Sequence, residues 1–194
     1  MKRMQSGATM MEVLVAILIV VIGLLGLAGL QARINLSEME AFQRAQALVL
    51  LQDMVDRVNA NKKNAASYVT LTPAGTGNPI TDCSALFDAA FDLCQWNNTL
   101  LGAAEATGGV KQGAMIDARG CVDQVTATMH AQYVVSVVWQ GINPTVAPTT
   151  ACGRGQYGAE NTRRAITANV LVGCLQTNPV TGTCITTPAV PPIR

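Results

Sequence analysis

The chain has 194 residues and a formal net charge of +1, a length that suits one domain plus an extended element. The near balance of charge excludes the basic surface expected of a nucleic-acid-binding protein. Charged residues make up only 13% of the chain, which favours a structural or exported protein over a cytosolic enzyme.

The first seven residues are basic and end at Gly7, and an apolar run follows over residues 13–30. Between Arg3 and Arg33 the only charged residue is Glu12. A helix through this run, rising about 1.5 Å per residue, is long enough to cross the hydrocarbon core of a bilayer. The basic end predicts that the N-terminus stays in the cytoplasm and that the rest of the chain is exported.

Three interpretations of this N-terminus compete. A secretory signal peptide fits the basic start, but the apolar run is too long and lacks a clear small-x-small cleavage site at its end. A plain membrane anchor fits the length but leaves Glu12 unexplained, because a carboxylate in the apolar zone costs about 2.5–3.5 kcal/mol. If the chain is instead cut after Gly7, Ala8 gains a free ammonium and Glu12 becomes the fifth residue. In a bundle of parallel helices that carboxylate can pair with the ammonium of a neighbouring subunit.

The segment Gly7-Ala8-Thr9-Met10-Met11-Glu12-Val13-Leu14-Val15-Ala16 resembles the class III signal of type IV pilins and pseudopilins. That signal has a Gly before the cut, a Glu five positions after it, and then an apolar helix; Ala8 stands where the family usually has Phe. The resemblance implies that a prepilin peptidase cuts after Gly7 and that Ala8 is N-methylated. It also implies that Glu12 is the carboxylate used in assembly.

Beyond residue 30 the pattern becomes amphipathic and predicts that one helix continues to about Asn61. Asp53 and Arg57 are four residues apart with the acid first, which supports the helix. Apolar side chains at helical spacing predict one stripe against a folded head, formed by Leu48, Leu51, Val55 and Val58.

Three glycines, Gly23, Gly26 and Gly29, interrupt the apolar half of the helix, and each costs about 1 kcal/mol of helix propensity against Ala. One interpretation is functional: the glycines allow helices to approach closely, or they loosen the helix locally inside a filament. The other is that they are ordinary glycines of a membrane helix. Both interpretations stay open.

The head contains one helix-like stretch and two clear strands. Thr81 or Asp82 is predicted to cap a short helix that carries Phe91 and Trp96 on its apolar side. Residues 101–120 are rich in Gly and Ala and predict a loop with at most a short strand. Alternation of β-branched and aromatic residues predicts strands at 132–140 and 163–173. Asn178, Pro179 and Gly182 predict a turn, and residues 188–194 form a proline-rich tail.

The six cysteines are even in number, lie after the apolar run, and contain no CxxC pair. With His130 as the only histidine, this argues against a zinc site and favours disulfides formed in an oxidising compartment. Fifteen pairings are possible; nearest-neighbour pairing is preferred, with one or two pairs of buried thiols as the alternative. The preferred pairs are Cys83 with Cys94, Cys121 with Cys152, and Cys174 with Cys184.

The residues predict no catalytic constellation, metal site or cofactor, and therefore no enzyme. His130 precedes a strand and is interpreted as a surface or loop residue. Asp88 and Asp92 are interpreted as an exposed, solvated helix face. Arg163 and Arg164 are interpreted as the start of a strand and not as an anion site.

Further segments are similar to those of PilV-type minor pilins. The resemblance implies a minor pilin that primes pilus assembly, with adhesion and twitching motility as consequences. The segments that carry it are residues 44–61 followed by Tyr68, Asp92-Leu93-Cys94-Gln95-Trp96, Trp139-Gln140-Gly141, Cys152-Gly153 and Arg163-Arg164.

The expected fold is α+β and pilin-like, with a long helix packed on a disulfide-bonded antiparallel sheet. Residues 1–7 would form the leader, 8–62 the assembly helix and 63–194 a periplasmic head. The subunit would cross the inner membrane once before it enters the pilus (fimbrium). Its partners would be the prepilin peptidase, the inner-membrane assembly machinery, other minor pilins and the major pilin, and no nucleic acid. The alternatives are a minor pseudopilin of a type II secretion system and a membrane-anchored periplasmic enzyme or binding protein.

Overall fold

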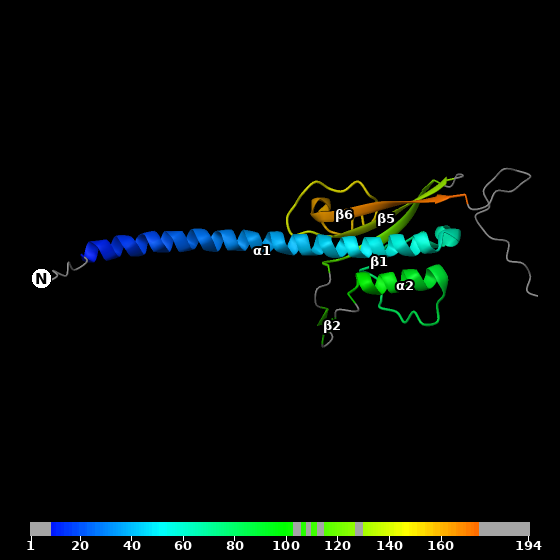
Figure 1. Cartoon of the computed structure of the whole chain (residues 1–194), viewed down its shortest axis with the longest axis horizontal. Coiled ribbons are helices and arrows are strands. Elements are labelled where there is room, and N and C mark those ends of the chain that lie inside the picture. Colours follow the sequence, from blue (N-terminus) through cyan, green and yellow to red (C-terminus); the bar gives the residue numbers. More distant parts are fainter. Residues whose placement is uncertain (1–8, 103–105, 108–109, 112–114, 127–129, 175–194) are drawn as a thin grey trace, which may run out of the picture. The chain divides into compact units, whose positions relative to one another are not determined.

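The computed structural model describes residues 9–102, 106–107, 110–111, 115–126 and 130–174 (Figure 1). It divides into two compact units, Met1–Ala41 and Phe42–Arg194. The long N-terminal helix, the four-stranded antiparallel sheet and the disulfides confirm the α+β, pilin-like class that the sequence predicts.

Helix α1 spans Met10–Ala60, 51 residues without a proline, and the 3₁₀ helix η1 follows at Lys62–Tyr68. The part of α1 from Phe42 onward belongs to the same compact unit as the sheet, because its inner side chains join the head core. The predicted stripe is partly wrong, since Leu48 is 51% exposed and Val55 is only half-buried. The buried apolar positions of α1 are Ala47, Leu51, Met54 and Val58.

The small Ala47 and the flexible Met54 explain this difference. Hydrophobicity alone favours Leu48 and Val55 over Ala47 and Met54. The predicted stripe and the observed stripe both have helical spacing, so spacing does not distinguish them. Packing against the head selects the side of α1 that carries Ala47 and Met54, both fully buried. The stripe is therefore turned slightly about the helix axis from the side that the sequence suggests.

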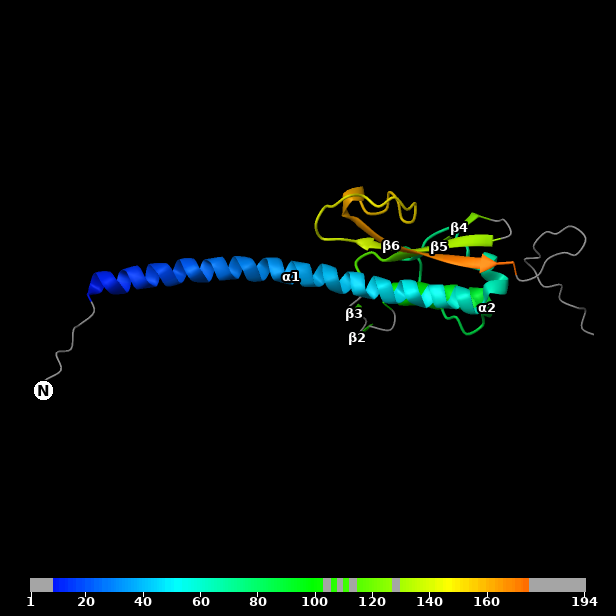
Figure 2. The same cartoon turned by 45° about the horizontal axis from the view of Figure 1, so that its top comes forward.

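The main sheet has the order β1-β4-β5-β6 and is antiparallel throughout (Figure 2). Strand β6 has the predicted limits, β5 begins two residues before the predicted start, and β4 is missing from the sequence prediction. Strand β4 shows no alternation to detect, because its first four residues are buried and the next three are exposed. The strands are β1 (Ala74–Gly75), β4 (Arg119–Thr126), β5 (His130–Gln140) and β6 (Arg163–Gly173).

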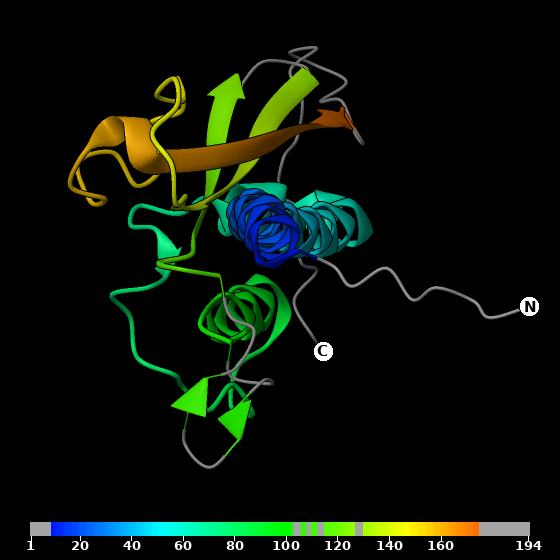
Figure 3. The same cartoon turned by 90° about the vertical axis from the view of Figure 1, so that its left-hand side faces the viewer.

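Helix α2 (Asp88–Leu100) and the second part of α1 pack on one face of this sheet (Figure 3). The central strands supply Val122, Val135 and Val137 to the core, all fully buried. A separate two-stranded sheet consists of β2 (Ala106–Thr107) and β3 (Val110–Lys111).

The predicted cap of the short helix is wrong. Helix α2 begins at Asp88, and Phe87 at its N-cap position makes no side-chain cap hydrogen bond. Asp82 instead accepts hydrogen bonds from the backbone and hydroxyl of Ser84, which closes a turn before the helix. The disulfide between Cys83 and Cys94 holds this turn beside the middle of α2, so the chain cannot enter the helix at residue 82.

Candidate functional site

The candidate assembly site starts at the first turn of α1. Thr9 precedes the helix, and its hydroxyl and carbonyl oxygens accept hydrogen bonds from the Glu12 backbone N–H at 3.3 and 3.0 Å. Thr9 thus acts as an N-cap, and the Glu12 carboxylate lies at the positive end of the helix dipole. Gly7 and Ala8 lie outside the described residues, so cleavage and N-methylation remain predictions.

The surface of α1 after Glu12 is apolar on every side. Each large apolar side chain from Val13 to Leu30 is at least 48% exposed, and Leu25 reaches 69%. Within the described part of the chain, α1 is the one helix long and apolar enough to cross a membrane. An apolar surface of this extent requires a covering of lipid or of other protein.

The three glycines of this surface contact none of the other described segments. A methyl group added at Gly23, Gly26 or Gly29 would meet nothing within 4 Å. Their small size therefore serves either a contact outside this chain or no contact at all, and both sequence interpretations remain open.

Two of the three preferred disulfides are present, between Cys83 and Cys94 and between Cys121 and Cys152. Cys174 is also disulfide-bonded. Cys184, its preferred partner, lies outside the described residues. The described cysteines are therefore not the buried thiols of the alternative interpretation.

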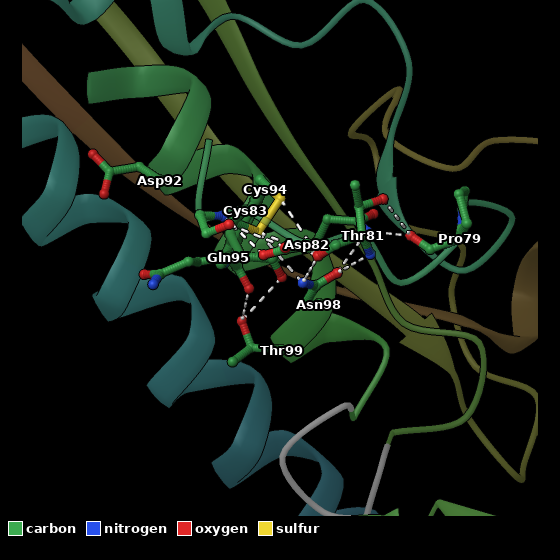
Figure 4. Close-up of a disulfide and its surroundings, with 12 residues drawn as sticks. Pro79, Thr81, Asp82, Cys83, Asp92, Cys94, Gln95, Asn98 and Thr99 are labelled. Atoms are coloured by element: carbon green, nitrogen blue, oxygen red, sulfur yellow. Dashed lines mark hydrogen bonds between the residues drawn. A yellow bond between two sulfur atoms is a disulfide. The ribbon is translucent and has the colours of Figure 1, made fainter. Parts of the chain in front are cut away.

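The disulfide between Cys83 and Cys94 attaches the segment before α2 to the helix itself (Figure 4). Next to it, the Asn98 side chain donates to the Thr81 carbonyl at 2.7 Å and accepts from the Thr81 N–H at 3.1 Å. Asn97 similarly donates to the Pro79 carbonyl at 3.0 Å. The covalent and amide contacts together fix this exposed segment on α2.

A polar cluster joins α1, η1 and α2 at the end of the long helix. The Arg57 guanidinium bonds to Asp53 at 3.0 Å, to Asp92 at 2.8 Å and to the Gln95 side chain at 2.9 Å. The buried Tyr68 hydroxyl donates to the other oxygen of Asp92. The interpretation of Asp92 as a solvated residue is therefore wrong, whereas Asp88 is exposed as expected.

The connection between β5 and β6 is ordered by a buried cation. Arg163 is 1% exposed and donates to the carbonyls of Pro148, Thr150 and Cys152 at 2.9 to 3.1 Å. Its charge is balanced by Glu160 at 2.7 Å. Arg163 begins β6, as the sequence interpretation has it, but its structural role in this connection was not predicted.

The signal that points to Arg57 and Arg163 in the sequence is the scarcity of charge. In a chain with so few charged residues, each arginine close to an acidic residue in a helix or turn is a candidate for a partly buried ion pair. The sequence gives no local pattern that predicts the contact of Arg57 with the distant Asp92, or the contacts of Arg163 with backbone carbonyls. His130 begins β5, and its side chain lies outside the described atoms.

One open cavity of about 420 Å³ lies between residues 69–81 and α2. Apolar side chains such as Val69, Leu86 and Leu93 line it with the amides of Asn78 and Asn97, and none of the described lining residues is ionisable. In the described ranges no group of three or more His, Cys, Asp or Glu residues could hold a metal ion.

No protein-family model matches this chain, and no curated protein or solved structure matches it. The features that bear on function are therefore the capped helix with Glu12, its exposed apolar surface, and a head held together by disulfides and partly buried ion pairs.

Proposed function

We propose that this chain is a minor pilin of a type IV pilus. The observation that carries the proposal is the position of Glu12, a lone carboxylate in the first turn of a helix whose large apolar side chains from Val13 to Leu30 are all exposed. A membrane alone would cover that surface but would leave the carboxylate in an unfavourable place. A bundle of parallel helices satisfies both requirements.

The charge pairing gives the helix a specific place in such a bundle. Cleavage after Gly7 creates an ammonium at Ala8, close to the level of Glu12 on a neighbouring helix. Both charges are costly to bury alone, and each lowers the cost of burying the other when they pair. Because only one axial offset brings the two groups together, the pair also sets the register between subunits.

The head has the properties that this role requires after export. Its disulfides suit an oxidising compartment such as the periplasm. Its core includes the second part of α1, so that part of the helix and the sheet belong to one folded unit. The subunit would wait in the inner membrane, and the assembly machinery would transfer it into a complex with other minor pilins and the major pilin. Priming of pilus assembly, and then adhesion or twitching motility, follow from that position.

The deciding experiment replaces Glu12 in cells that make the pilus. For Glu12→Ala we expect normal removal of residues 1–7 but at least about tenfold less subunit in sheared pili, because an unpaired buried charge costs about 3–5 kcal/mol. The N-terminal residue is read by mass spectrometry, and incorporation is measured by immunoblot of pilus and membrane fractions. The matched control is Glu38→Ala, an exposed acid on the same helix.

Equal incorporation of both variants would remove the role proposed for Glu12. Recovery of the wild-type chain with residues 1–7 still attached would instead favour a membrane-anchored protein of another class. Incorporation that depends on a type II secretion system and not on pilus genes would identify a minor pseudopilin.

A further inference from the structure

The two described disulfides differ in how well they are shielded from solvent. Cys121 and Cys152 are 6% and 4% exposed and belong to a small buried core of their own. Cys94 is only half-buried and lines the open cavity between residues 69–81 and α2, whereas its partner Cys83 is 8% exposed. A thiolate in solution therefore has access to the Cys94 side of one disulfide while the other disulfide is covered.

The surroundings of the two exposed-disulfide sulfurs also differ. The Asn98 amide donates a hydrogen bond to Cys83 Sγ at 3.4 Å, and the Thr81 carbonyl oxygen lies near both sulfurs, at 3.5 Å from Cys83 and 3.8 Å from Cys94. A donor stabilises a thiolate, and the better stabilised thiolate leaves a disulfide faster. Access and hydrogen bonding thus favour the same direction of exchange, with attack at Cys94 and departure of Cys83 (Figure 4).

The disulfide is the main attachment of the turn that precedes α2. Residues 82–86 form this turn, and their remaining hydrogen bonds stay within it. Every described bond from the turn to α2 involves Cys83, namely its disulfide with Cys94 and the hydrogen bond from Asn98. Leu86 contributes an apolar side chain to the cavity wall. Opening of the disulfide would therefore release one wall of the cavity from the helix.

We infer that the disulfide between Cys83 and Cys94 is a reversible redox switch that holds or releases the turn beside the cavity. The reductant is a dithiol of the Cys-x-x-Cys class. Its thiolate bonds to Cys94 Sγ, the bond between the two cysteines breaks, and the electron pair leaves on Cys83 next to Asn98. The second thiol of the reductant then displaces Cys94, so the dithiol becomes a disulfide and its two protons pass to the two cysteines.

The neighbouring amide contacts make the change reversible. The Asn98 side chain donates to the Thr81 carbonyl at 2.7 Å and accepts from the Thr81 N–H at 3.1 Å, and neither bond depends on the disulfide. Cys83 is two residues from Thr81 and therefore stays close to Cys94 after reduction. Its high effective concentration favours closure within one molecule over pairing with a second copy. The switch does not depend on whether the chain enters a pilus.

Timed reduction of the full-length protein in detergent tests this inference. Dithiothreitol is added, free thiols are alkylated at intervals, and the modified cysteines are identified by mass spectrometry. We expect the disulfide at Cys94 to be reduced at least about tenfold faster than that at Cys121, at a rate proportional to dithiothreitol concentration. The rate at Cys121 should instead level off, because that disulfide becomes accessible only when the head opens. Equal rates would overturn the inference.

The direction of exchange is read with a thioredoxin whose second active-site cysteine is replaced by serine, which stops the reaction at the mixed disulfide. We expect the captured residue to be Cys94, and capture at Cys83 would contradict the proposed direction. Hydrogen exchange then compares the oxidised and reduced protein. The Leu86 N–H, bonded within the turn, should exchange at least about tenfold faster after reduction, while the Thr81 N–H stays protected. An unchanged Leu86 amide would show that the disulfide does not hold the turn.

Asn98→Asp separates stabilisation of the leaving sulfur from simple loosening. The variant keeps an oxygen for the Thr81 N–H but replaces the donor to Cys83 with a carboxylate oxygen, so we expect about tenfold slower reduction. A merely structural role of Asn98 would give faster reduction, because the turn would be looser. Thr99→Asp, an exposed position next in the helix, adds the same charge without a sulfur contact and should react at the wild-type rate. Equal or faster reduction of Asn98→Asp would remove the role of Asn98.

Discussion

The indole ring of Trp96 lies directly on Gly120, where an added methyl group would come within 2.2 Å of a ring carbon. Trp96 is fully buried, and its Nε1 donates to the Leu50 carbonyl at 2.9 Å. One side chain therefore joins α2, the long helix and strand β4. The absence of a side chain at residue 120 is what lets α2 approach the sheet so closely.

Gly120→Ala should destabilise the head by about 1–3 kcal/mol or more, because Trp96 is held by packing and by its hydrogen bond and cannot move away easily. The free energy of unfolding is measured by urea denaturation of the full-length protein in detergent, followed by tryptophan fluorescence. Gly173→Ala is the matched control, since a methyl group there meets nothing within 4 Å. Equal losses in the two variants would show that Trp96 does not limit the space at residue 120.

Removal of Arg57 should loosen the junction between the two helices. Arg57→Ala leaves Asp53, Asp92 and Gln95 without their shared donor, so we expect a loss of about 1.5–3 kcal/mol in unfolding free energy. The exposed Arg44 on the same helix offers a control, and Arg44→Ala should change stability by no more than about 0.5 kcal/mol. The prediction is wrong if the two variants unfold at the same urea concentration.

The two described disulfides should differ in their contribution to stability. They close sequence separations of 11 and 31 residues, for which chain entropy gives about 3 and about 4 kcal/mol. Replacing both Cys121 and Cys152 by Ser should therefore lower the unfolding free energy more than the same change at Cys83 and Cys94. Denaturation of the two double variants under non-reducing conditions compares them, and the reverse order would contradict the entropic argument.

Two buried tyrosines should make the head sensitive to alkali. Burial, aided by the hydrogen bond to Asp92, raises the pKa of Tyr68 from 10.0 to about 12, and burial likewise raises the pKa of Tyr157 to about 12 although Arg119 opposes this shift. Between pH 10 and about pH 12 these tyrosines stay protonated in the folded head but are ionised in the unfolded chain. This stabilisation is complete below pH 10 and is lost as the pH rises through about 12.

Denaturant titrations of the full-length protein from pH 8 to pH 12 measure this dependence. We expect a constant contribution below about pH 10 and a steep decline above it. Tyr157→Phe should be less stable overall but should lose less stability over the alkaline range than the wild type. An equally steep decline in that variant would assign the alkaline sensitivity to other groups.

The sequence indicated the elements whose evidence is local. The unbroken apolar run and the absence of proline predicted α1, β-branched alternation predicted β5 and β6, and the even number of cysteines predicted disulfides. Glu12 could be singled out because a charge in an apolar run is visible without any structure. Nearest-neighbour pairing of the cysteines is confirmed for the two described disulfides, since short separations close most easily.

Tertiary packing decided what depends on residues far apart in the chain. It turned the buried stripe of α1 toward Ala47 and Met54, brought Asp92 to Arg57, and enclosed Arg163 among carbonyl groups of the connection before β6. It also formed β4 from residues whose alternation is weak, because pairing with β5 supplies the hydrogen bonds that its own sequence cannot specify. Local patterns state which side chains avoid water, whereas only the folded chain determines which partners satisfy their charges and hydrogen bonds.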